Sequence, residues 1–492
     1  MQQISTLIVY TTMSTFKKYE EEVSFQAEMR KATVEFINIV NNLWYEKAIE
    51  LVLFRNQLID KRASEILNLI NYAKEFVAKP ISIFDALDFA KAIQSIELPS
   101  SKLDIGKLAY ECHLSEDACD DKISFVKNKL KRATTSENIA PKDVVLYGFG
   151  RIGRLLAREL MNKMGKGSQL RLRAVVTRGD INKTVLEKRA SLLSIDSVHG
   201  DFLGTVQVDV ENKALIINGT TVYMISANQP EDIDYTVYGI NDALIIDNTG
   251  AFRDKEALSR HLVAKGASKV LLTAPGKGVP NIVHGVNHAE NNPDVIDIFS
   301  AASCTTNAIT PVLKVLEDNF GINKGHLETI HAYTNDQNLV DNMHSKYRRG
   351  RAAALNMVIT ETGAGAAVAK ALPALEGKLT SNAIRVPVPN GSLAILSLQL
   401  HTDATVESIN AIMKKYALEG DLVEQIKYSI DNELVSSDIV GCSAPSIFDS
   451  KATITDGNSI VIYVWYDNEY GYSHQVIRLA KHIAKVRRFT YY

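Results

Sequence analysis

Cys304 and His331 are the two side chains of this sequence best suited to nucleophilic chemistry. Cys304 stands in the stretch Ser303-Cys304-Thr305-Thr306-Asn307, and the residues after it have the apolar spacing of a helix: Val312, Leu313, Val315 and Leu316. A thiol at a helix N-terminus lies at the positive end of the helix dipole, and a neighbouring histidine also favours its ionised form, so we expect a lowered thiol pKa. The thiolate would be the nucleophile and His331 its proton acceptor. The alternative is that both residues are ordinary members of the core.

A glycine-rich turn upstream predicts a dinucleotide site. The apolar strand Val144 to Tyr147 runs into Gly148-Phe149-Gly150-Arg151-Ile152-Gly153, and a helical pattern follows. In this G-x-G-x-x-G pattern the glycines allow a tight turn, a close approach of the backbone to a pyrophosphate, and close packing of helix on strand. The pyrophosphate then lies on the helix N-terminus. We therefore expect five residues of the turn to bind a cofactor: Gly148, Gly150, Arg151, Ile152 and Gly153.

The end of the next predicted strand bears on the choice between NAD and NADP. That strand covers Leu170 to Thr177 and is followed by Arg178-Gly179-Asp180. A carboxylate at this place binds the ribose 2′-hydroxyl of NAD. Arg178 stands where the acid is expected, and a cation suits the 2′-phosphate of NADP better. The alternative is that Arg178 is a solvated loop charge and that Asp180 binds the ribose.

From about Lys142 to about Val486 the chain resembles phosphorylating glyceraldehyde-3-phosphate dehydrogenase. Besides the glycine turn and the cysteine motif, four stretches carry the resemblance: Asp196-Ser197-Val198-His199-Gly200, His331-Ala332-Tyr333-Thr334-Asn335-Asp336-Gln337, Arg385-Val386-Pro387-Val388-Pro389-Asn390 and Trp465-Tyr466-Asp467-Asn468-Glu469-Tyr470-Gly471-Tyr472-Ser473. The sequence departs from the family pattern at Tyr147, where an asparagine usually stands, and at Arg178. A short basic insertion between Asn162 and Gln169 is a third departure.

The resemblance implies roles for individual residues. Cys304 matches the nucleophile, and His331 matches its base and later acid. Thr334 and Arg385 match the site for the substrate's own phosphate. Four positions match the site for the attacking inorganic phosphate: Ser303, Thr305, Thr362 and Gly363. Five positions match cofactor contacts, with the first of them orienting the nicotinamide carboxamide: Asn468, Thr249, Gly250, Thr273 and Tyr472.

The implied reaction is the reversible, phosphorylating oxidation of D-glyceraldehyde 3-phosphate to 1,3-bisphosphoglycerate, with NAD, NADP or both as cofactor. Cys304 would add to the aldehyde, the nicotinamide would take the hydride, and phosphate would attack the resulting thioester. Such an enzyme serves glycolysis or gluconeogenesis. The stretch Tyr347 to Ala354 resembles the family loop that reaches toward a neighbouring subunit's cofactor, so a homotetramer is implied.

The composition is that of an ordinary soluble globular protein. The 492 residues carry a formal net charge of −2, and 46% of them are hydrophobic. This balance favours neither nucleic acid nor a membrane as a partner, and no apolar run is long enough to span a bilayer. Four cysteines are too few for a disulfide framework in a chain of this length, which indicates a reducing cytoplasm. Cys112, Cys119 and His113 supply too few ligands for a metal site, so no metal is expected.

Residues 1–138 lie outside the resemblance and have a different composition. Gly106 is the only one of the 27 glycines within the first 140 residues. Two stripes have helical spacing: Ile37, Val40, Trp44, Ala48 and Leu51, then Ala63, Ile66, Leu67, Ile70 and Ala73. A third helix is expected over Asp120 to Lys131, followed by a polar linker over Lys131 to Asn138. We expect a helical appendage packed on the catalytic body or its oligomer, with a partner-binding or regulatory module as the alternative.

The expected fold class is α/β, with a Rossmann domain and an α+β catalytic domain preceded by an all-helical N-terminal region. The expected boundaries are 1–138 for the extension and linker, 139–302 for the NAD(P)-binding domain, 303–472 for the catalytic domain, and 473–492 for a C-terminal helix that returns to the Rossmann domain. Two other functions stay open. One is erythrose-4-phosphate dehydrogenase, with the same chemistry on a longer sugar, and the other is a non-catalytic binding protein derived from the enzyme.

Overall fold

The computed structural model describes residues 2–115, 121–133, 139–163, 165 and 167–492, with side chains from residue 18 onward. The chain divides into two compact units. The smaller unit holds Met1–Ile139, Gly165–Gly167 and Arg488–Tyr492, and the larger unit holds Ala140–Met164 and Ser168–Arg487. Gly165–Gly167, a part of the basic insertion, and Arg488–Tyr492 at the end of the chain therefore belong with the N-terminal region.

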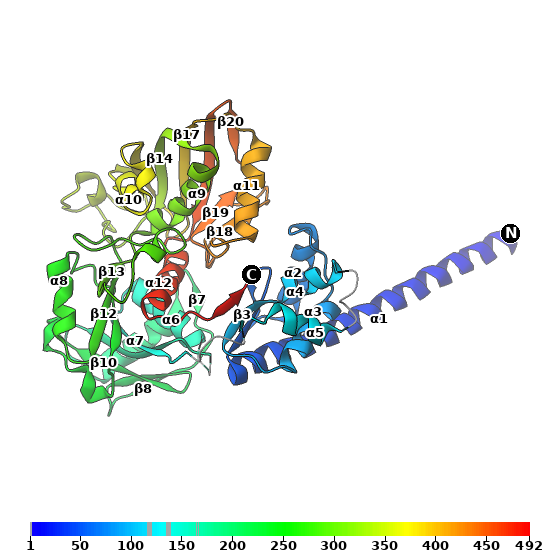
Figure 1. Ribbon diagram of the computed structural model, residues 1–492, viewed down its shortest axis with the longest axis horizontal. Helices are drawn as coiled ribbons and strands as arrows, with labels where there is room; N and C mark the ends of the chain where they lie inside the picture. Colours follow the sequence, from blue (N-terminus) through cyan, green and yellow to red (C-terminus); the bar gives the residue numbers. More distant parts are fainter. Residues whose placement is uncertain (1, 116–120, 134–138, 164, 166) are drawn as a thin grey trace. The chain divides into compact units, whose positions relative to one another are not determined.

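The larger unit begins with a Rossmann domain (Figure 1). Six parallel strands lie in the order β13-β12-β11-β4-β5-β10, so β4, which leads into the glycine turn, is central. β9 and β8 extend the sheet in the antiparallel sense. This strand order is that of dinucleotide-binding folds and confirms the predicted fold. The bounds are β4 Lys142–Tyr147, β5 Leu170–Thr177, β8 Val206–Asp209, β9 Ala214–Ile217, β10 Thr220–Ser226, β11 Ala243–Asp247, β12 Ala267–Leu272 and β13 Ile298–Ser300.

The helix after the glycine turn, α6 (Arg151–Asn162), buries Leu155, Leu156 and Leu160. The helices α7 (Lys183–Ser194) and α8 (Lys255–Ser259) also belong to this domain. A short hairpin of β6 (Ile195–Asp196) and β7 (Gly200–Asp201) follows α7. The larger unit also contains short 3-10 turns: η2 Pro230–Asp232, η3 Tyr235–Tyr238, η4 Arg260–Val263, η5 His288–Glu290, η6 Tyr347–Gly350 and η7 Pro373–Leu375.

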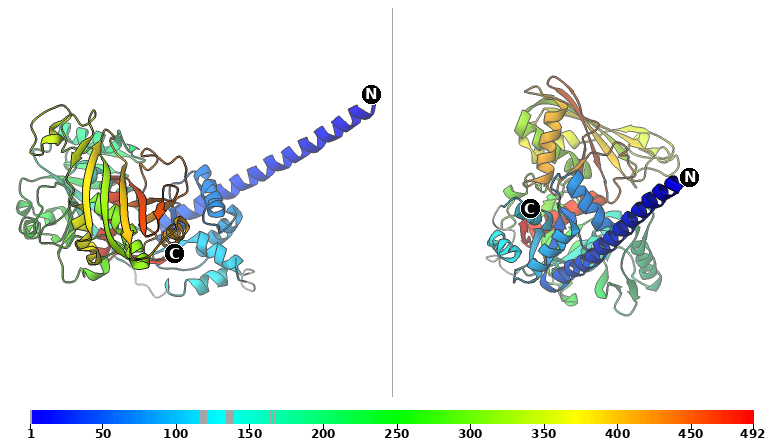
Figure 2. Two further views of the ribbon diagram at one scale, coloured as in Figure 1. Left: turned by 90° about the horizontal axis from the view of Figure 1, so that it is seen from above. Right: turned by 90° about the vertical axis from the view of Figure 1, so that its right-hand side faces the viewer.

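A second, mixed sheet forms the catalytic part, in the order β15-β16-β14-β17-β21-β19-β18, with β20 paired to β21. Its long strands, yellow to orange, run side by side in Figure 2. α9 (Cys304–Phe320) packs against this sheet and buries the predicted apolar stripe in its core. α10 (Ala364–Ala371) and α11 (Val406–Leu418) adjoin α9, and α12 (Tyr470–Ile483) packs against both α9 and α6. The strand bounds are β14 Ile322–Ala332, β15 Val358–Thr360, β16 Leu379–Val386, β17 Ser392–Leu400, β18 Ile426–Ser429, β19 Ser446–Asp449, β20 Ile454–Asp456 and β21 Ser459–Tyr466.

The smaller unit combines helices with a four-stranded sheet in the order β2-β1-β3-β22. β1 and β3 are parallel, and β2 forms an antiparallel hairpin with β1. Its helices are α1 Gln2–Lys47, α2 Ala63–Glu75, α3 Ile83–Gln94, α4 Ile105–His113 and α5 Lys122–Lys129. Its strands are β1 Ile49–Leu53, β2 Asn56–Gln57, β3 Ser101–Asp104 and β22 Phe489–Tyr491.

The prediction that the N-terminal region is all-helical was therefore wrong. The first stripe stops being helical at Ala48, whose φ of 60° ends α1, and Leu51 lies in the buried strand β1. A short apolar run has no periodicity that separates a buried strand from a helix, which is why Ile49–Leu53 was misassigned. The second stripe lies in α2 as predicted. The third helix is α5; Asp120 and most of the expected linker lie outside the described residues.

The end of the chain also differs from its expected assignment. α12 ends at Ile483, and Arg488–Tyr492 joins the sheet of the smaller unit instead of the Rossmann domain.

Cys304 and Cys442 are free, whereas Cys112 is disulfide-bonded. Within the described ranges, no helix is both long and apolar enough to cross a membrane, and no three potential metal-ligating side chains gather into a metal site.

Candidate active site

Cys304 is the first residue of α9, and the local sequence starts the helix there. The Ser303 backbone is extended, and its Oγ accepts a hydrogen bond from the Thr306 N–H at 3.1 Å. Serine is a preferred residue at this capping position. The first N–H groups of a helix have no partner within the helix, so a negatively charged group beside Sγ can accept hydrogen bonds from them.

His331 lies beside the thiol, near the end of β14. Its Nε2 is 3.6 Å from Sγ of Cys304, and its Nδ1 is 2.7 Å from the carbonyl oxygen of Ala332. A guanidinium nitrogen of Arg385 lies 3.0 Å from the same Nδ1. The carbonyl can only accept a hydrogen bond and the guanidinium can only donate one, so the two neighbours favour opposite tautomers. The tautomer that suits a proton acceptor for Cys304 is the one with its proton on Nδ1, which leaves the Nε2 lone pair facing the thiol.

Burial controls the ionisation of this pair. Burial raises the pKa of the Cys304 thiol, while Arg385 opposes the rise. Burial, and then the positive charge of Arg385, lower the pKa of His331 to about 3. The shift of the thiol pKa is therefore opposite to the expected one. Nε2 of His331, 3.6 Å from Sγ, is the ring nitrogen that faces the thiol.

Tyr466, the last residue of β21, supports the pair from within the core. Its hydroxyl lies 3.0 Å from Oγ1 of Thr305 and 2.6 Å from Oγ1 of Thr329, and its ring meets His331 edge-on at 5.9 Å between centroids. It thereby joins α9 to β14. The hydroxyl and the backbone N–H of Thr305 also form hydrogen bonds with the Cys304 thiol, and both act to lower the pKa of that thiol. Sequence analysis missed Tyr466 because its position is that of an ordinary core aromatic.

Arg385 and Thr334 lie next to His331. β16 runs parallel to β14, and the register places Arg385 opposite His331. One guanidinium nitrogen of Arg385 donates to the Ala332 carbonyl at 3.0 Å and to Oγ1 of Thr334 at 3.1 Å. The two residues predicted to bind the substrate phosphate are therefore adjacent to each other and to the predicted base.

A second arginine, Arg349, belongs to the same cluster. Its Nε donates to Oγ1 of Thr360 at 3.0 Å, and its guanidinium pairs with Asp336. Asp336 in turn accepts a hydrogen bond from the Thr334 hydroxyl. Burial, and then the charge of Arg349, lower the pKa of Arg385, which indicates that the two cations are close. The sequence did contain this arginine, but in the basic loop that was assigned to subunit contacts.

Thr362 and Gly363 lie at the start of α10, which packs against α9. Gly363 caps the helix, and an added Cβ there would have no neighbour within 4 Å. Oγ1 of Thr362 accepts a hydrogen bond from the Ala364 N–H at 3.3 Å. Two helix N-termini, those of α9 and α10, thus carry the residues predicted to bind the attacking phosphate.

The glycine turn fits a pyrophosphate. Gly148 has a φ of 104°, a conformation that side chains other than glycine rarely adopt. A Cβ on Gly153 would lie 2.6 Å from the carbonyl oxygen of Gly148, so this position also requires glycine. At Gly150, the residue before α6, a Cβ would meet nothing within 4 Å. The backbone at the start of α6 is therefore open to an anion.

Asp247 orients the second predicted cofactor loop. One of its carboxylate oxygens accepts from the N–H and hydroxyl of Thr249 at 2.8 and 2.7 Å, and the other lies 3.0 Å from Nε2 of the buried His261. Its backbone carbonyl accepts from the hydroxyl of Thr273 at 3.1 Å. Thr249, Gly250 and Thr273 follow the carboxyl ends of β11 and β12, the edge at which Rossmann folds bind dinucleotides.

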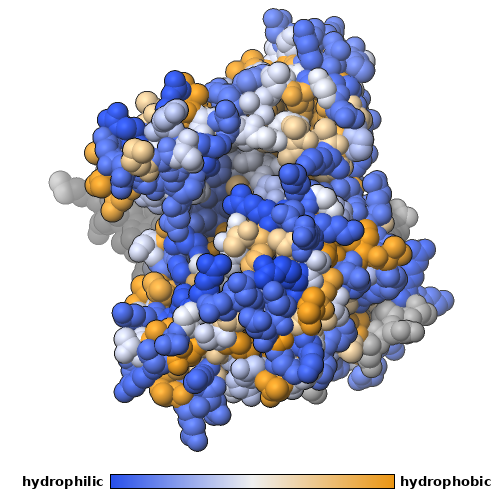
Figure 3. All heavy atoms as spheres, turned by 90° about the vertical axis from the view of Figure 1, so that its left-hand side faces the viewer, coloured by the Kyte–Doolittle hydropathy of each residue, from blue (hydrophilic) through white to orange (hydrophobic). Residues whose placement is uncertain are grey.

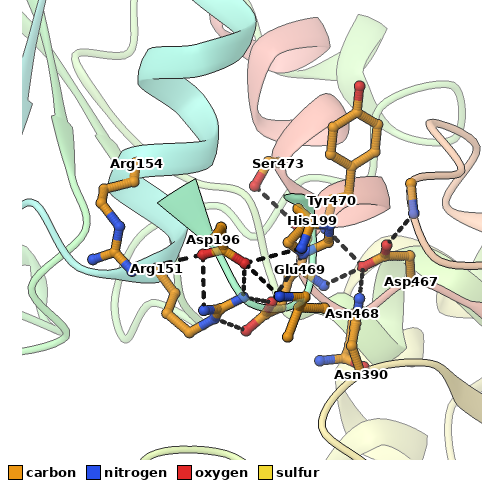
Figure 4. A network of polar contacts seen from close by, with 12 residues as sticks. Arg151, Arg154, Asp196, His199, Asn390, Asp467, Asn468, Glu469, Tyr470 and Ser473 are labelled. Atoms are coloured by element: carbon orange, nitrogen blue, oxygen red, sulfur yellow. Dashed lines mark hydrogen bonds and ion pairs between the residues drawn. The ribbon is translucent and has the colours of Figure 1, made fainter. Parts of the chain in front are cut away.

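A network of charged residues joins the glycine turn to the start of α12 (Figure 4). The Arg151 guanidinium lies 2.5 Å from Glu469 and 3.0 Å from Asp196, and Glu469 lies 3.0 Å from Nε2 of His199. Burial opposes ionisation of Asp196, but backbone hydrogen bonds and Arg151 lower its pKa to about 2. Because two carboxylates hold the Arg151 side chain, its backbone N–H is the part that can face a cofactor. Sequence analysis gave no role to Glu469.

Asn468 is held so that one end of its amide is available. Its Oδ1 accepts from the Ser392 hydroxyl at 2.9 Å, and that hydroxyl accepts from the Ala332 N–H at 3.1 Å. The amide nitrogen of Asn468 is the end that can donate to a carboxamide. Tyr472 is buried and donates its hydroxyl to the Ala302 carbonyl at 3.0 Å, which ties α12 to the segment before Cys304.

Arg178 is exposed immediately after β5. The neighbouring Thr177 is buried, and its hydroxyl has no hydrogen-bond partner among the described residues. The end of β5 therefore combines an exposed cation with an unsatisfied hydroxyl.

Known proteins are similar to this chain in sequence. The NAD binding domain of glyceraldehyde 3-phosphate dehydrogenase matches residues 142–255, and the C-terminal domain of that enzyme matches residues 303–468. Glyceraldehyde-3-phosphate dehydrogenase 2 of Trichormus variabilis is 42% identical over 344 residues, which are 70% of this chain and 98% of the relative. The chain belongs to the glyceraldehyde-3-phosphate dehydrogenase family. The resemblance seen in the sequence is thereby confirmed, and the protein is a dehydrogenase with NAD(P) as its cofactor.

Relatives of this dehydrogenase family differ in how much of the chain they share. Glyceraldehyde-3-phosphate dehydrogenase 1 of Bacillus subtilis is 41% identical over 344 residues, 70% of this chain and 98% of the relative. A glyceraldehyde-3-phosphate dehydrogenase-like protein of Pseudomonas aeruginosa is 47% identical over 458 residues, 92% of this chain and 98% of the relative. A match of that length must include much of residues 1–138, so the N-terminal region is shared with that relative.

Proposed function

We propose that the protein catalyses the reversible oxidation of D-glyceraldehyde 3-phosphate to 1,3-bisphosphoglycerate, using inorganic phosphate and NAD(P), through a thioester on Cys304. The observation that carries this proposal is the 3.6 Å separation of Sγ of Cys304 from Nε2 of His331 at the N-terminus of α9. A thiol nucleophile, a base and helix N–H groups are what acyl transfer through sulfur requires.

The steps follow from this geometry. Nε2 of His331 takes the thiol proton as Sγ adds to the aldehyde carbon, and the oxygen that gains charge is stabilised by the Cys304 N–H and the protonated ring. The aldehyde carbon then loses a hydride, for which bound NAD(P) would supply the acceptor, and its carbonyl re-forms as a thioester on Cys304. Phosphate then attacks the thioester carbon, the carbon–sulfur bond breaks, and Cys304 leaves as a thiolate with an acyl phosphate as the product.

An assay with and without phosphate tests the proposal. The proposal predicts NAD(P)H formation from glyceraldehyde 3-phosphate at a rate that depends on added phosphate. A higher kcat/KM for erythrose 4-phosphate would favour the alternative dehydrogenase. Absence of turnover with either aldehyde, in protein that still binds NAD(P), would favour a binding protein derived from the enzyme.

Arg385 and Thr334 hold the substrate phosphate in this proposal, with Arg349 close by. Arg385→Leu should lower kcat/KM for glyceraldehyde 3-phosphate by about 10- to 100-fold more than for unphosphorylated glyceraldehyde, because one charge-assisted hydrogen bond is lost. The ratio is the informative measurement, because Arg385 also lowers the pKa of His331 and this effect is common to both substrates. Arg351→Leu, which removes a more exposed arginine, is the control. Equal losses with both aldehydes would contradict the assignment.

The attacking phosphate is assigned to Ser303, Thr305, Thr362 and Gly363. The open N-termini of α9 and α10 support this assignment, since helix N-termini bind anions. The cofactor is assigned to the glycine turn, to Thr249, Gly250 and Thr273, and to Asn468 at the nicotinamide. Tyr472 then acts by positioning, because its hydroxyl is already bonded to Ala302.

We infer that the enzyme accepts NADP, with Arg178 and the buried hydroxyl of Thr177 facing the 2′-phosphate. Arg178→Asp should shift the ratio of kcat/KM for NADP over NAD toward NAD by about 1–3 kcal/mol, the size of one hydrogen bond to a charged group. Lys183→Asp, which changes another exposed cation on the same segment, should leave the ratio within about twofold. Strict use of NAD by the unmodified protein would contradict this inference and point to Asp180.

We also propose a homotetramer that works in the cytoplasm, in glycolysis or gluconeogenesis. The segment around η6 exposes large apolar side chains, as an interface would: Leu339, Val340, Met343, Tyr347, Leu355 and Met357. Apolar patches also occur among hydrophilic side chains on the face drawn in Figure 3.

We keep residues 139–302 as the cofactor domain and 303–472 as the catalytic domain, and we assign residues 488–492 to the smaller unit.

A further inference from the structure

We propose that the smaller unit is a binding site for an extended segment of the type arginine-x-x-aromatic-aromatic, and that its resident ligand is the chain's own residues 488–492. This inference does not depend on the proposed reaction. It rests on a paired backbone, a buried arginine site and a cationic site for two tyrosines, which recognise different parts of the segment.

The backbone of the segment is bound as an added strand. β22 pairs in parallel with β3, with Phe489 opposite Ser101, Thr490 opposite Lys102 and Tyr491 opposite Leu103. This pairing completes the sheet β2-β1-β3-β22. Strand addition of this kind gives affinity through the main chain, while side-chain pockets give specificity.

The first position of the segment has a buried site for a cation. Arg488 is only 8% exposed, and its guanidinium lies 4.6 Å from the centre of the Trp44 ring. The guanidinium lies 3.6 Å from a carboxylate oxygen of Glu50, which is itself buried, and it donates to the carbonyl of Gly167. Taking a guanidinium out of water is costly unless it is paired, so this site selects for arginine and against a neutral or acidic residue.

The last two positions meet a group of cations. The Tyr492 ring lies 4.7 Å from the Arg55 guanidinium and 5.3 Å from the Lys102 ammonium. The Tyr491 ring lies 4.9 Å from the ammonium of Lys107, and its hydroxyl donates to Glu111 at 2.6 Å. A cation above the face of an aromatic ring attracts that ring, so the cations at this end of the site favour tyrosine in the segment.

Buried Asp104 builds this cationic end. Its carboxylate accepts from the Arg55 side chain at 2.9 Å, from the Arg55 N–H at 3.1 Å, and from the Lys107 N–H at 3.1 Å. These bonds lie within β1, β3, α4 and their connections, all from the N-terminal region. The site is therefore formed by residues remote in sequence from its ligand, and it should accept the same segment as a separate peptide.

A peptide in trans tests the proposal. A chain ending at residue 487 should bind acetyl-Arg-Phe-Thr-Tyr-Tyr saturably at one site per chain, measured by titration calorimetry. The peptide with glutamate in place of arginine should bind to the shortened chain at least tenfold more weakly. The arginine peptide should also bind at least tenfold more weakly to the full chain, because residues 488–492 already occupy the site there. The proposal would be overturned if the two peptides bound the shortened chain equally, or if the arginine peptide bound the full chain as tightly as the shortened one. It would also be overturned if the shortened chain folded but bound no peptide saturably.

A second variant covers the case in which the shortened chain does not fold. A specific protease sequence is inserted between residues 487 and 488 of the full chain, and the folded protein is then cut. The released segment should stay with the protein through gel filtration, and an excess of the arginine peptide, but not of the glutamate peptide, should displace it. Loss of the segment immediately after cutting would overturn the proposal.

Discussion

Cys304→Ser should abolish aldehyde oxidation. A serine hydroxyl is far harder to ionise than a thiol, and a histidine whose pKa burial and Arg385 lower to about 3 is too weak a base to compensate. The glycine turn and the loop at Thr249 do not contact the thiol through any hydrogen bond of the described residues, so binding of NAD(P) should persist. Steady-state turnover and cofactor titration of the same preparation measure the two effects.

Cys442 provides the matched control. Among the residues that the structure describes, it is the other free cysteine, and it is partly buried like Cys304. Cys442→Ser should retain its turnover and its cofactor binding. Full activity of Cys304→Ser, or loss of activity in Cys442→Ser alone, would remove Cys304 from the mechanism.

The larger unit was predictable because its signals are local. The strand at Val144 to Tyr147, the glycines that follow, and the apolar stripe of α6 lie within about 20 consecutive residues, where turn geometry and helix spacing act directly. The same holds for Ser303 and the stripe of α9. In the N-terminal region the pattern of Ile49–Leu53 was ambiguous, and its partner β3 lies some 50 residues away, so the sheet could not be foreseen.

The contacts of the site that escaped prediction depend on long-range register. Arg385 meets His331 because β16 and β14 pair in parallel, and Glu469 meets Arg151 because α12 returns to α6. Tyr466 supports Cys304 and His331 only because the end of β21 packs against α9. None of these contacts leaves a periodic or compositional trace in the sequence. Without the family resemblance, Thr334, Arg385 and Asn468 would have been missed as well.

The electrostatics of the site oppose the expected lowering of the Cys304 thiol pKa. A helix N-terminus and a histidine favour a thiolate, but burial acts on the same thiol in the opposite direction and raises its pKa. In the proposed mechanism, proton transfer to His331 is the route by which the thiolate forms. The role of His331 in making the nucleophile can be separated from its role in later steps, because alkylation of the thiol reports on the first role alone.

His331→Asn should lower turnover by about 10²–10⁴-fold, the usual size of a general acid–base contribution. It should also slow the reaction of Cys304 with iodoacetamide at pH 7 by at least about tenfold, because the thiol, whose pKa burial raises, then lacks the imidazole that accepts its proton in the proposed mechanism. As the pH rises through that thiol pKa, the thiolate fraction grows and the alkylation rate of the variant should approach that of the unmodified protein. His326→Asn, an exposed histidine on the same strand, should change neither rate. Alkylation of His331→Asn at the unmodified rate at pH 7 would show that the helix N-terminus alone ionises the thiol.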